Sequence, residues 1–164
     1  MSSRRIVLSL ADGEYDMDLV RTLFREYADW LRVDYCLQDF DAELADLPGK
    51  YAPPGGGVWL ARVDGKMAGT IAFCPSKDGL CEMKRFWVRE EFRGLGIGRR
   101  LAKACVAAAR AAGYTAMCLD TLSDMTAARA LYEDLGFREI PDHDDNLPDD
   151  VRYMRCEFAD LPAR

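Results

Sequence analysis

The sequence predicts a mixed α/β domain in which one central, mostly antiparallel sheet of about seven strands is flanked by about four helices. Its length of 164 residues suits one domain, so residues 1–164 are expected to form a single unit. Short apolar runs of strand length alternate with longer runs at helical spacing. Asp64-Gly65 separates two strand-like runs and predicts a hairpin, because glycine accepts the positive φ of such a turn.

The N-terminal half is expected to supply four strands and two helices. Leu19, Phe24 and Trp30 belong to an apolar stripe at helical spacing, which is typical of a helix packed on a core. Pro48-Gly49 ends a second, shorter helix, and the Pro- and Gly-rich stretch 50–57 predicts irregular structure. The expected elements are a strand at 5–10, helices at 14–32 and 39–47, and strands at 58–63, 67–74 and 80–88.

The C-terminal half is expected to supply two helices and three strands. The run 99–112 is rich in Ala, Leu, Lys and Arg, which favours a helix that Gly113 closes. Ser123 or Asp124 is expected to cap the next helix, and Gly136 to end it in the left-handed conformation. The expected elements are helices at 99–112 and 125–135 and strands at 115–119, 137–140 and 151–158, which completes the order βααβββαβαββ.

The charge balance limits the classes of partner. A net charge of −6 argues against a sequence-independent grip on nucleic acid or on anionic lipid, because both need a basic face. No apolar run approaches the ~18 residues of a membrane span. The N-terminal residues lead directly into a strand and not into a signal-peptide core. We therefore expect a cytoplasmic protein that binds neither nucleic acid nor membrane.

The cysteines do not form a metal-binding pattern. The six cysteines stand singly, without a Cys-x-x-Cys pair, and the one histidine, His143, lies in an acidic stretch where exposure to solvent is expected. We expect no metal site, and cysteines that are reduced and buried as small apolar residues. A catalytic cysteine is the alternative interpretation.

The most informative motif is a glycine-rich loop between the strand-like run 82–88 and a helix. Gly94, Gly96 and Gly98 occupy every second position, so no Cβ holds an anion away from the backbone there. Consecutive N–H groups and the positive end of a helix dipole can then face one pyrophosphate. Arg93 and Arg99 add positive charge beside it.

Other phosphate-binding motifs fit less well. A P-loop requires Lys-Ser/Thr after its last glycine, where this chain has Arg99-Arg100. A dinucleotide fingerprint requires Gly-x-Gly-x-x-Gly, whereas these glycines are evenly spaced. A kinase loop is followed by a strand, and here a helix is expected.

The segment Arg93-Gly94-Leu95-Gly96-Ile97-Gly98 resembles the Arg/Gln-x-x-Gly-x-Gly/Ala loop of the GNAT superfamily of acyl-coenzyme A N-acyltransferases. A second block, residues 128–137, resembles the later signature of that superfamily, a helix that carries a tyrosine and ends in Gly-Phe. The two blocks stand in the order that the superfamily shows. The clear resemblance covers residues 80–139 and implies the GNAT fold, with acetyl-CoA as cosubstrate.

The resemblance also implies which residues hold the coenzyme. The backbone of the strand would pair with the pantetheine arm where two strands separate, and one N–H, that of Val88, would polarise the thioester carbonyl. The glycine loop would hold the pyrophosphate. The implied coenzyme-binding residues are Phe86, Trp87, Val88, Arg93, Gly94, Leu95, Gly96, Ile97, Gly98 and Arg99.

Two side chains are candidates for proton transfer. By resemblance, the phenol of Tyr132 would donate a proton to the departing thiolate, or else the ring only packs against the coenzyme arm. Glu82 stands at the position where histone-acetylating branches carry a glutamate base, and it is otherwise a solvated carboxylate or a direct ligand of a cationic substrate. Period-two alternation places Lys84, Phe86 and Val88 on the same face as Glu82, unless a bulge interrupts the strand.

The acceptor side is less well defined. Many superfamily members have an asparagine seven residues before the tyrosine, where this chain has Met125, so Ser123, Asp124 or Thr126 would replace that contact. The stretch 50–57 either gates the acceptor site or is a connector. The acidic stretch 141–150 either attracts a cationic acceptor or is solvated surface. Trp30, Tyr35 and Tyr51 either border the acceptor or pack as ordinary core residues.

Two functions from different classes remain. The first is an acetyl-CoA-dependent N-acetyltransferase that acts on a small-molecule or peptide amine by direct attack in a ternary complex. The second is a coenzyme-binding sensor or assembly module without turnover. Tyr132 and Glu82 favour the enzyme, because a binding module needs neither. The resemblance is also compatible with a homodimer.

Overall fold

The computed structural model describes residues 3–31, 39–141 and 148–163. They form one seven-stranded sheet in the order β1-β2-β3-β4-β5-β7-β6, in which β4 and β5 are parallel and all other neighbours are antiparallel. The strands are β1 (Ile6–Leu10), β2 (Gly57–Val63), β3 (Lys66–Pro75), β4 (Cys81–Val88), β5 (Ala116–Leu122), β6 (Arg138–Glu139) and β7 (Val151–Glu157). The helices are α1 (Gly13–Trp30), α2 (Phe40–Asp46), α3 (Ile97–Ala111) and α4 (Thr126–Asp134). The predicted fold class and element order are confirmed.

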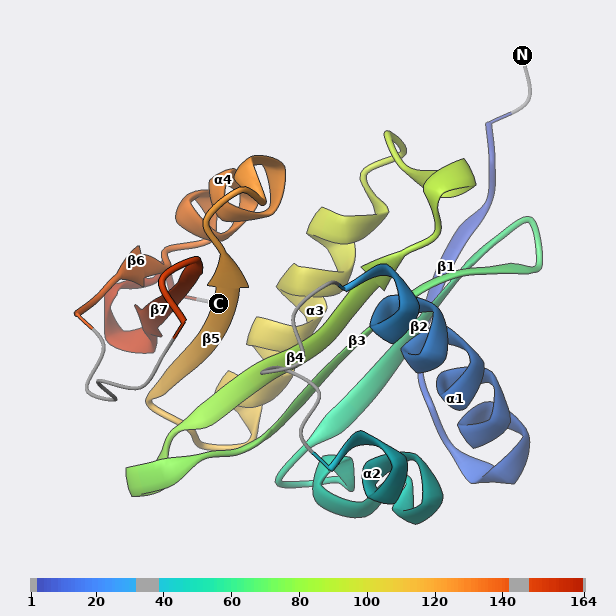
Figure 1. Ribbon diagram of the computed structural model, residues 1–164, viewed down its shortest axis with the longest axis horizontal. Coiled ribbons are helices and arrows are strands. Elements are labelled where there is room, and N and C mark those ends of the chain that lie inside the picture. Colours follow the sequence, from blue (N-terminus) through green and yellow to red (C-terminus); the bar gives the residue numbers. More distant parts are fainter. Residues whose placement is uncertain (1–2, 32–38, 142–147, 164) are drawn as a thin grey trace.

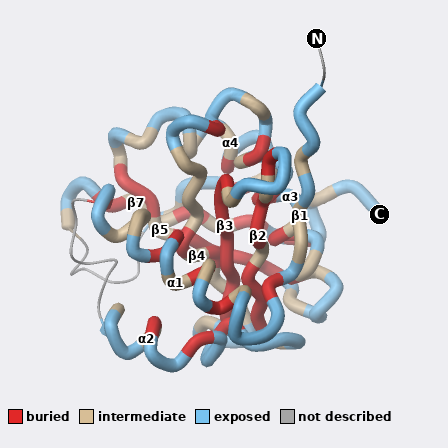
Figure 2. Tube along the Cα trace, turned by 90° about the vertical axis from the view of Figure 1, so that its right-hand side faces the viewer, coloured by how far each residue is buried: buried red, intermediate tan, exposed pale blue. Residues whose placement is uncertain are grey.

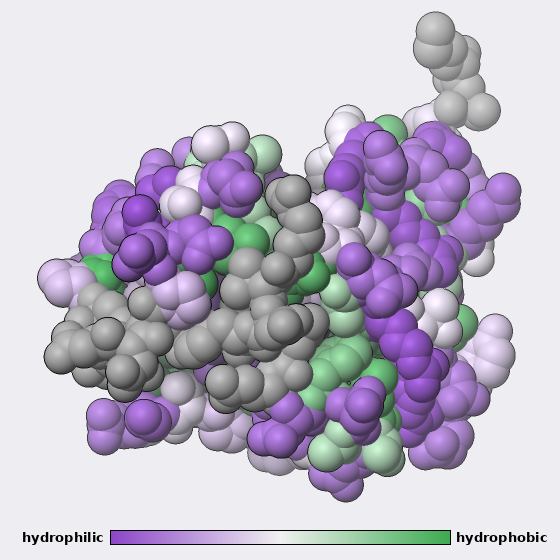
Figure 3. All heavy atoms as spheres, in the orientation of Figure 1, coloured by the Kyte–Doolittle hydropathy of each residue, from purple (hydrophilic) through white to green (hydrophobic). Residues whose placement is uncertain are grey.

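The sheet lies between two helical layers (Figure 1). Helices α1 and α2 cover one face, where buried side chains such as Phe24 and Leu44 pack with Leu60 and Ala72 of the sheet. Helix α3 covers the other face together with α4, and its Leu101 lies in the larger apolar cluster. Figure 2 shows buried residues concentrated along the central strands and exposed residues on the helices. Hydrophilic side chains dominate the face that Figure 3 shows.

A β-bulge in β4 changes which way its side chains point. Lys84 lies opposite Ala72 and Trp87 lies opposite Thr70, so Arg85 and Phe86 together face Ile71 alone. Arg85 adopts a φ of 58°, which is the left-handed conformation that L-residues avoid.

The bulge corrects the simple alternation expected for this strand. Glu82 and Lys84 lie toward α1 and α2, whereas Phe86 and Val88 pack into the cluster on the α3 face. The exception stated for a bulge therefore applies: Phe86 and Val88 leave the face of Glu82 and Lys84, because one extra residue shifts the period-two pattern.

Strands β4 and β5 pair only at their beginnings. Cys81 lies opposite Met117 and Glu82 opposite Cys118, and no further register continues the pair. Beyond these residues, β4 carries the bulge, while β5 continues to pair with β7 as far as Leu122. The two parallel strands therefore separate at the centre of the sheet, as the resemblance implied.

Several predicted boundaries need correction. Helix α3 begins at Ile97 and not at Arg99, because Gly96 takes the position before the first turn with a φ of 79°. Helix α4 has Met125 at its N-cap with no side-chain capping bond, so the predicted capping by Ser123 or Asp124 is wrong. The stretch 50–57, expected to be irregular, overlaps a single 3₁₀ turn at Gly49–Tyr51. Gly136 has a φ of 105° after α4, as predicted.

Some sequence predictions concern residues that the structure does not describe. Tyr35, Cys36 and His143, and most of the acidic stretch 141–150, lie outside the described residues. Cys74, Cys81, Cys105, Cys118 and Cys156 are free and buried, as expected. Within the described ranges, none of the helices has the length and apolar character that a bilayer crossing requires.

Candidate active site

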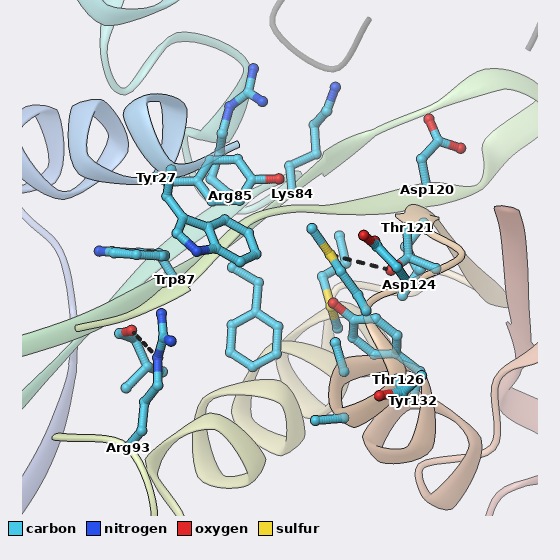
Figure 4. Close-up of a pocket in the computed structure, with 18 residues that line it drawn as sticks. Tyr27, Lys84, Arg85, Trp87, Arg93, Asp120, Thr121, Asp124, Thr126 and Tyr132 are labelled. Atoms are coloured by element: carbon cyan, nitrogen blue, oxygen red, sulfur yellow. Dashed lines mark hydrogen bonds between the residues drawn. The ribbon is translucent and has the colours of Figure 1, made fainter. Parts of the chain in front are cut away.

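A cavity of about 410 Å³ opens where β4 and β5 separate (Figure 4). Its walls come from α1, the bulged half of β4, Arg93 before the glycine loop, the end of β5, the segment that follows it, and α4. Apolar and aromatic side chains provide much of the lining, and charged groups stand among them. The lining residues are Tyr27, Trp30, Met83, Lys84, Arg85, Phe86, Trp87, Val88, Arg93, Leu119, Asp120, Thr121, Asp124, Met125, Thr126, Ala127, Ala128 and Tyr132.

The backbone of Val88 faces this opening. Arg89 lies opposite Ala68 and donates its N–H to the Ala68 carbonyl at 2.8 Å, so the main-chain groups of Arg89 point toward β3. Val88 lies opposite Gly69, and hydrogen-bonded and non-bonded pairs alternate along antiparallel strands. The Val88 N–H and carbonyl therefore point away from β3. Nε of Arg93 donates to that carbonyl at 3.1 Å.

The main-chain groups of Trp87, unlike those of Val88, do not face the opening. Its main-chain groups belong to the pair with Thr70 and point toward β3. Its indole nitrogen donates to Glu26 at 3.2 Å, and the Arg93 guanidinium lies 5.1 Å from the centroid of the ring. Trp87 thus lines the cavity through its side chain.

The glycine loop leads into α3 with unpaired amides at its start. The first bond within the helix runs from the Arg100 N–H to the Gly96 carbonyl at 3.2 Å, so the N–H groups of Ile97, Gly98 and Arg99 precede it. Nothing lies within 4 Å of the Cβ positions of Gly94 and Gly96, both of which have positive φ. These amides, open space and the helix dipole together suit an anionic group.

Each remaining part of the loop has a defined structural role. A Cβ on Gly98 would stand 3.2 Å from the edge of the Phe86 ring, so Gly98 allows α3 to approach β4. The side chain of Ile97 is buried and fixes the first turn of the helix in the core. Arg99 makes an exposed ion pair with Asp134 of α4 at 3.0 Å. Leu95 packs against the cluster on the α3 face.

A family model for the acetyltransferase (GNAT) family matches residues 18–137. The chain belongs to the GNAT family. An uncharacterised N-acetyltransferase of Schizosaccharomyces pombe is 36% identical over 161 residues, which cover 97% of this chain and 99% of the relative. Human N-acetylaspartate synthetase is 36% identical over 100 residues, 60% of this chain and 33% of that protein. GNAT membership supports the predicted N-acetyltransferase activity.

Solved GNAT structures share the fold at low sequence identity. A putative acetyltransferase of Salmonella typhimurium, solved with its cofactor acetyl-CoA, superimposes with a TM-score of 0.74 at 20% identity, and 96% of each chain is covered. At this identity the likeness concerns the fold alone.

Tyr132, the proton donor that the resemblance implies, lies on α4. Its hydroxyl points into the cavity from α4 (Figure 4). The ring is buried, and its centroid lies 6.2 Å from that of Phe86 and 5.9 Å from that of Phe137. Burial, with a smaller contribution from Tyr27, raises the pKa of Tyr132 above its ordinary value. The phenol therefore keeps its proton throughout the neutral and mildly alkaline range.

Glu82 does not belong to the set of residues that line the cavity. Its side chain is 24% exposed, and its carboxylate lies 3.8 Å from the Lys84 ammonium. Burial is the main cause that raises the pKa of Tyr153, and the charges of Glu82 and Asp120 add to it, so both carboxylates lie near this phenol. Glu82 thus lies on the α1/α2 side of the sheet, beside the cavity and not within its wall.

Sequence reasoning did not single out every group in the cavity. The cavity is also lined by Tyr27, Lys84, Arg85 and Asp120. Their common location could be predicted only by someone who already knew that β4 and β5 separate. Of the three proposed substitutes for the missing asparagine, Asp124 and Thr126 line the cavity and Ser123 does not. The Met125 sulfur accepts a hydrogen bond from the Thr121 hydroxyl at 3.8 Å. Trp30 also lines the cavity, whereas Tyr51 is buried outside it.

Arg85 is tied to α2 by a buried ion pair. Its Nε and Nη2 donate to the two oxygens of Glu43 at 2.8 and 3.1 Å, and both side chains are less than a tenth exposed. The Tyr51 hydroxyl donates to Glu43 at 2.9 Å, and Lys50 lies 3.1 Å from the same carboxylate. Burial alone would raise the pKa of Glu43, but the hydrogen bonds and charge of Arg85 hold it below the usual value. The Arg85–Glu43 ion pair thus connects the bulge of β4 to α2.

Neither a catalytic cysteine nor a metal centre is supported by the described residues. None of their cysteines lines the cavity. Burial raises the pKa of the Cys74 and Cys156 thiols to about 11 and that of Cys81 to about 12, which opposes thiolate formation. No group of three or more histidine, cysteine or acidic side chains suited to a metal occurs in these parts of the chain.

Proposed function

We propose that the chain transfers the acetyl group of acetyl-CoA to a primary amine of a small molecule or peptide by direct attack within a ternary complex. The observation that carries this proposal is the opening between β4 and β5. The Val88 backbone faces it from one strand, and the Tyr132 hydroxyl points into it from α4. The product named by the human relative, an N-acetylated amino acid, agrees with an amine acceptor.

The coenzyme fits the described residues in two places. The diphosphate would lie against the amides of residues 95–99, with Arg93 nearby, where no Cβ blocks the approach. The pantetheine arm would enter the separation and pair with the outward main-chain groups of Val88. Trp87 would contribute its ring. The thioester would then lie between β4 and α4.

The chemical step needs two proton transfers. The amine nitrogen attacks the acetyl carbon, a C–N bond forms, and the carbonyl oxygen gains negative charge that the Val88 N–H stabilises. The C–S bond then breaks, and the departing thiolate takes a proton from the Tyr132 phenol. The ammonium form of the acceptor must first lose a proton, which we assign to Glu82 through an intervening water molecule.

The indirect role of Glu82 follows from its position. A general base acts either within hydrogen-bond reach of its proton or through one water. Glu82 lies beside the cavity and is partly exposed, so the second case applies. Glu82→Gln should lower kcat/KM for the amine by about 10²-fold while the KM for acetyl-CoA stays unchanged. If Asp120→Asn or Asp124→Asn gives this effect and Glu82→Gln does not, the assignment is wrong.

Thiol release from acetyl-CoA tests the proposed function. The assay uses a panel of amino acids, polyamines, aminoglycosides and peptide N-termini, each with and without the protein. Acceptor-dependent release, together with mass-spectrometric detection of an acetylated amine, would support the transferase. Saturable binding of acetyl-CoA without acceptor-dependent release from any amine would favour the coenzyme-binding module instead.

A further inference from the structure

Charged side chains divide the cavity into two walls of opposite sign. Lys84 and Arg85 extend from β4, whereas Asp120 extends from β5 and Asp124 precedes α4, beside Tyr132 (Figure 4). Arg93 is the other cation in the lining, and it lies toward the glycine loop, where its Nε is bonded to the Val88 carbonyl.

The two cations on the β4 wall differ in how they are compensated. Arg85 is held by both oxygens of Glu43 at 2.8 and 3.1 Å, so its charge is balanced from α2. The Lys84 ammonium lies 3.8 Å from Glu82, which is beyond hydrogen-bond distance. Throughout the part of the chain that the structure describes, no hydrogen bond satisfies the Lys84 ammonium, although its side chain is only 24% exposed.

A partly buried ammonium with unused donors favours an anionic ligand. A hydrogen bond between ions is about twice as strong as a neutral one, so an anionic group that replaces water at the Lys84 ammonium forms a strong contact. On the other side of the cavity, Asp124 lies beside the phenol that would protonate the thiolate, whereas Asp120 lies nearer to Tyr153. An anionic group of the acceptor would therefore lie on the Lys84 side, while the attacking amine must lie toward the thioester, beside Tyr132.

We propose that the acceptor is an amino acid whose carboxylate binds the Lys84 ammonium while its amine lies toward the Tyr132 wall. A polyamine would place positive charge beside Lys84, and an amine without an anionic group would leave the Lys84 donors to water. This inference rests on the proposed transferase function. It adds an acceptor subsite and the residue that determines acceptor class.

The test compares pairs of acceptors that differ only by a carboxylate. Each L-amino acid is assayed beside its decarboxylated amine, for example phenylalanine beside 2-phenylethylamine, at saturating acetyl-CoA. Values of kcat/KM are expressed per unprotonated amine, so that differences in amine pKa cancel. We expect at least one amino acid to exceed its decarboxylated partner by tenfold or more.

Lys84→Met should remove this preference. The variant keeps the length of the side chain and deletes its charge, so kcat/KM for the preferred amino acid should fall by about 10- to 100-fold. Because Lys84 also lies 3.8 Å from Glu82, activity on the decarboxylated amine should fall as well, but by much less, so the ratio of the two kcat/KM values should drop toward one. Lys103→Met is the matched control, because Lys103 is an exposed residue of α3 on the other face of the sheet.

Three outcomes would contradict the proposal. If decarboxylated amines react as well as amino acids, the carboxylate subsite does not exist. If Lys84→Met lowers kcat/KM equally for both acceptors, Lys84 does not bind the carboxylate. If acetyl-CoA binds but no amine at all is acetylated, the proposed function itself fails. The comparison of acceptors uses the unaltered protein, so it decides the matter even if the variant does not fold.

Discussion

At the level of single residues, the phenol of Tyr132 has the surroundings that a proton donor needs. Burial keeps the Tyr132 hydroxyl protonated, and this hydroxyl still reaches the cavity. Phe86 and Phe137 hold the ring from two sides, so its direction is fixed by packing. Because the pKa of Tyr132 in the folded protein is raised above its ordinary value, the phenol stays protonated between pH 6 and 9. Loss of the Tyr132 proton should therefore not lower activity in that pH range.

Tyr132→Phe deletes one oxygen and preserves the packing. We expect kcat to fall by about 10²-fold, because a general acid contributes at least that factor, with little change in the KM for acetyl-CoA. Steady-state thiol release and the unfolding midpoint in urea are the measurements. A tyrosine that only packs against the coenzyme arm would instead change KM and leave kcat within a few-fold.

At the level of elements, the bulge of β4 depends on a buried ion pair with α2. Removing one partner of such a pair leaves an uncompensated charge and costs about 3–5 kcal/mol. Glu43→Gln should therefore lower the free energy of unfolding by roughly that amount. Glu26→Gln is the matched control, since Glu26 also pairs with an arginine of the same segment, Arg89, at 2.7 Å.

The control pair is far more exposed, with side chains 27% and 32% accessible, so its loss should cost about 1 kcal/mol or less. Urea denaturation of both variants gives the comparison. Equal losses would show that Glu43 does not stabilise the bulge beyond an ordinary surface contact.

The same pair predicts how stability depends on pH. The folded-state pKa of Glu43 is lower than the ordinary value of 4.5, so its contribution is complete above that pH and is lost as pH falls through the lower folded value. The wild-type protein should therefore lose stability more steeply below pH 4.5 than Glu43→Gln does. Parallel curves for the two proteins would contradict this assignment.

The glycine loop is the second element that can be tested separately. Gly96 has a φ of 79° and open space at its Cβ position, so Gly96→Ala adds strain and a methyl group where the diphosphate would lie. We expect the KM for acetyl-CoA to rise about tenfold, as when one charged hydrogen bond is weakened.

Gly113→Ala controls for the strain alone. Gly113 has a φ of 99°, equally open surroundings and a place at the far end of α3. Both variants should lose about 1–2 kcal/mol of stability from the left-handed backbone, and only Gly96→Ala should weaken the coenzyme. A similar change in KM for both variants would mean that the loop does not bind the diphosphate.

Much of the fold, and part of the site, could be predicted from the sequence. The hairpin at Asp64-Gly65, the glycine loop and the end of α4 at Gly136 carry local signals, because each needs a backbone conformation that glycine adopts. The bulge at Arg85 has no such signal, since this buried arginine with a positive φ is paired with Glu43, which lies 42 residues earlier in the chain. Lys84 and Asp120 line one cavity because β4 and β5 separate, and no local sequence signal marks that separation.

At the level of the whole molecule, three separated segments meet at one opening. Residues 93–99 form the glycine loop and the first residues of α3, β4 contributes the outward backbone of Val88, and α4 supplies Tyr132. Beyond the point of separation, β5 still pairs with β7 and β4 still pairs with β3. Each strand therefore keeps one hydrogen-bonded neighbour. The opening is thus held by the sheet itself, and a coenzyme arm can enter it without breaking a strand pair.

The central claim is that acetyl-CoA enters this opening with its diphosphate on the α3 amides. Two-dimensional ¹H–¹⁵N NMR of the uniformly labelled protein, titrated with acetyl-CoA, tests it most directly. The account predicts saturable shifts centred on the amides of Val88, Leu95, Ile97 and Gly98, with β1 and the end of α3 near Gly113 unaffected. A folded protein whose spectrum does not change, or changes away from these amides, would contradict it.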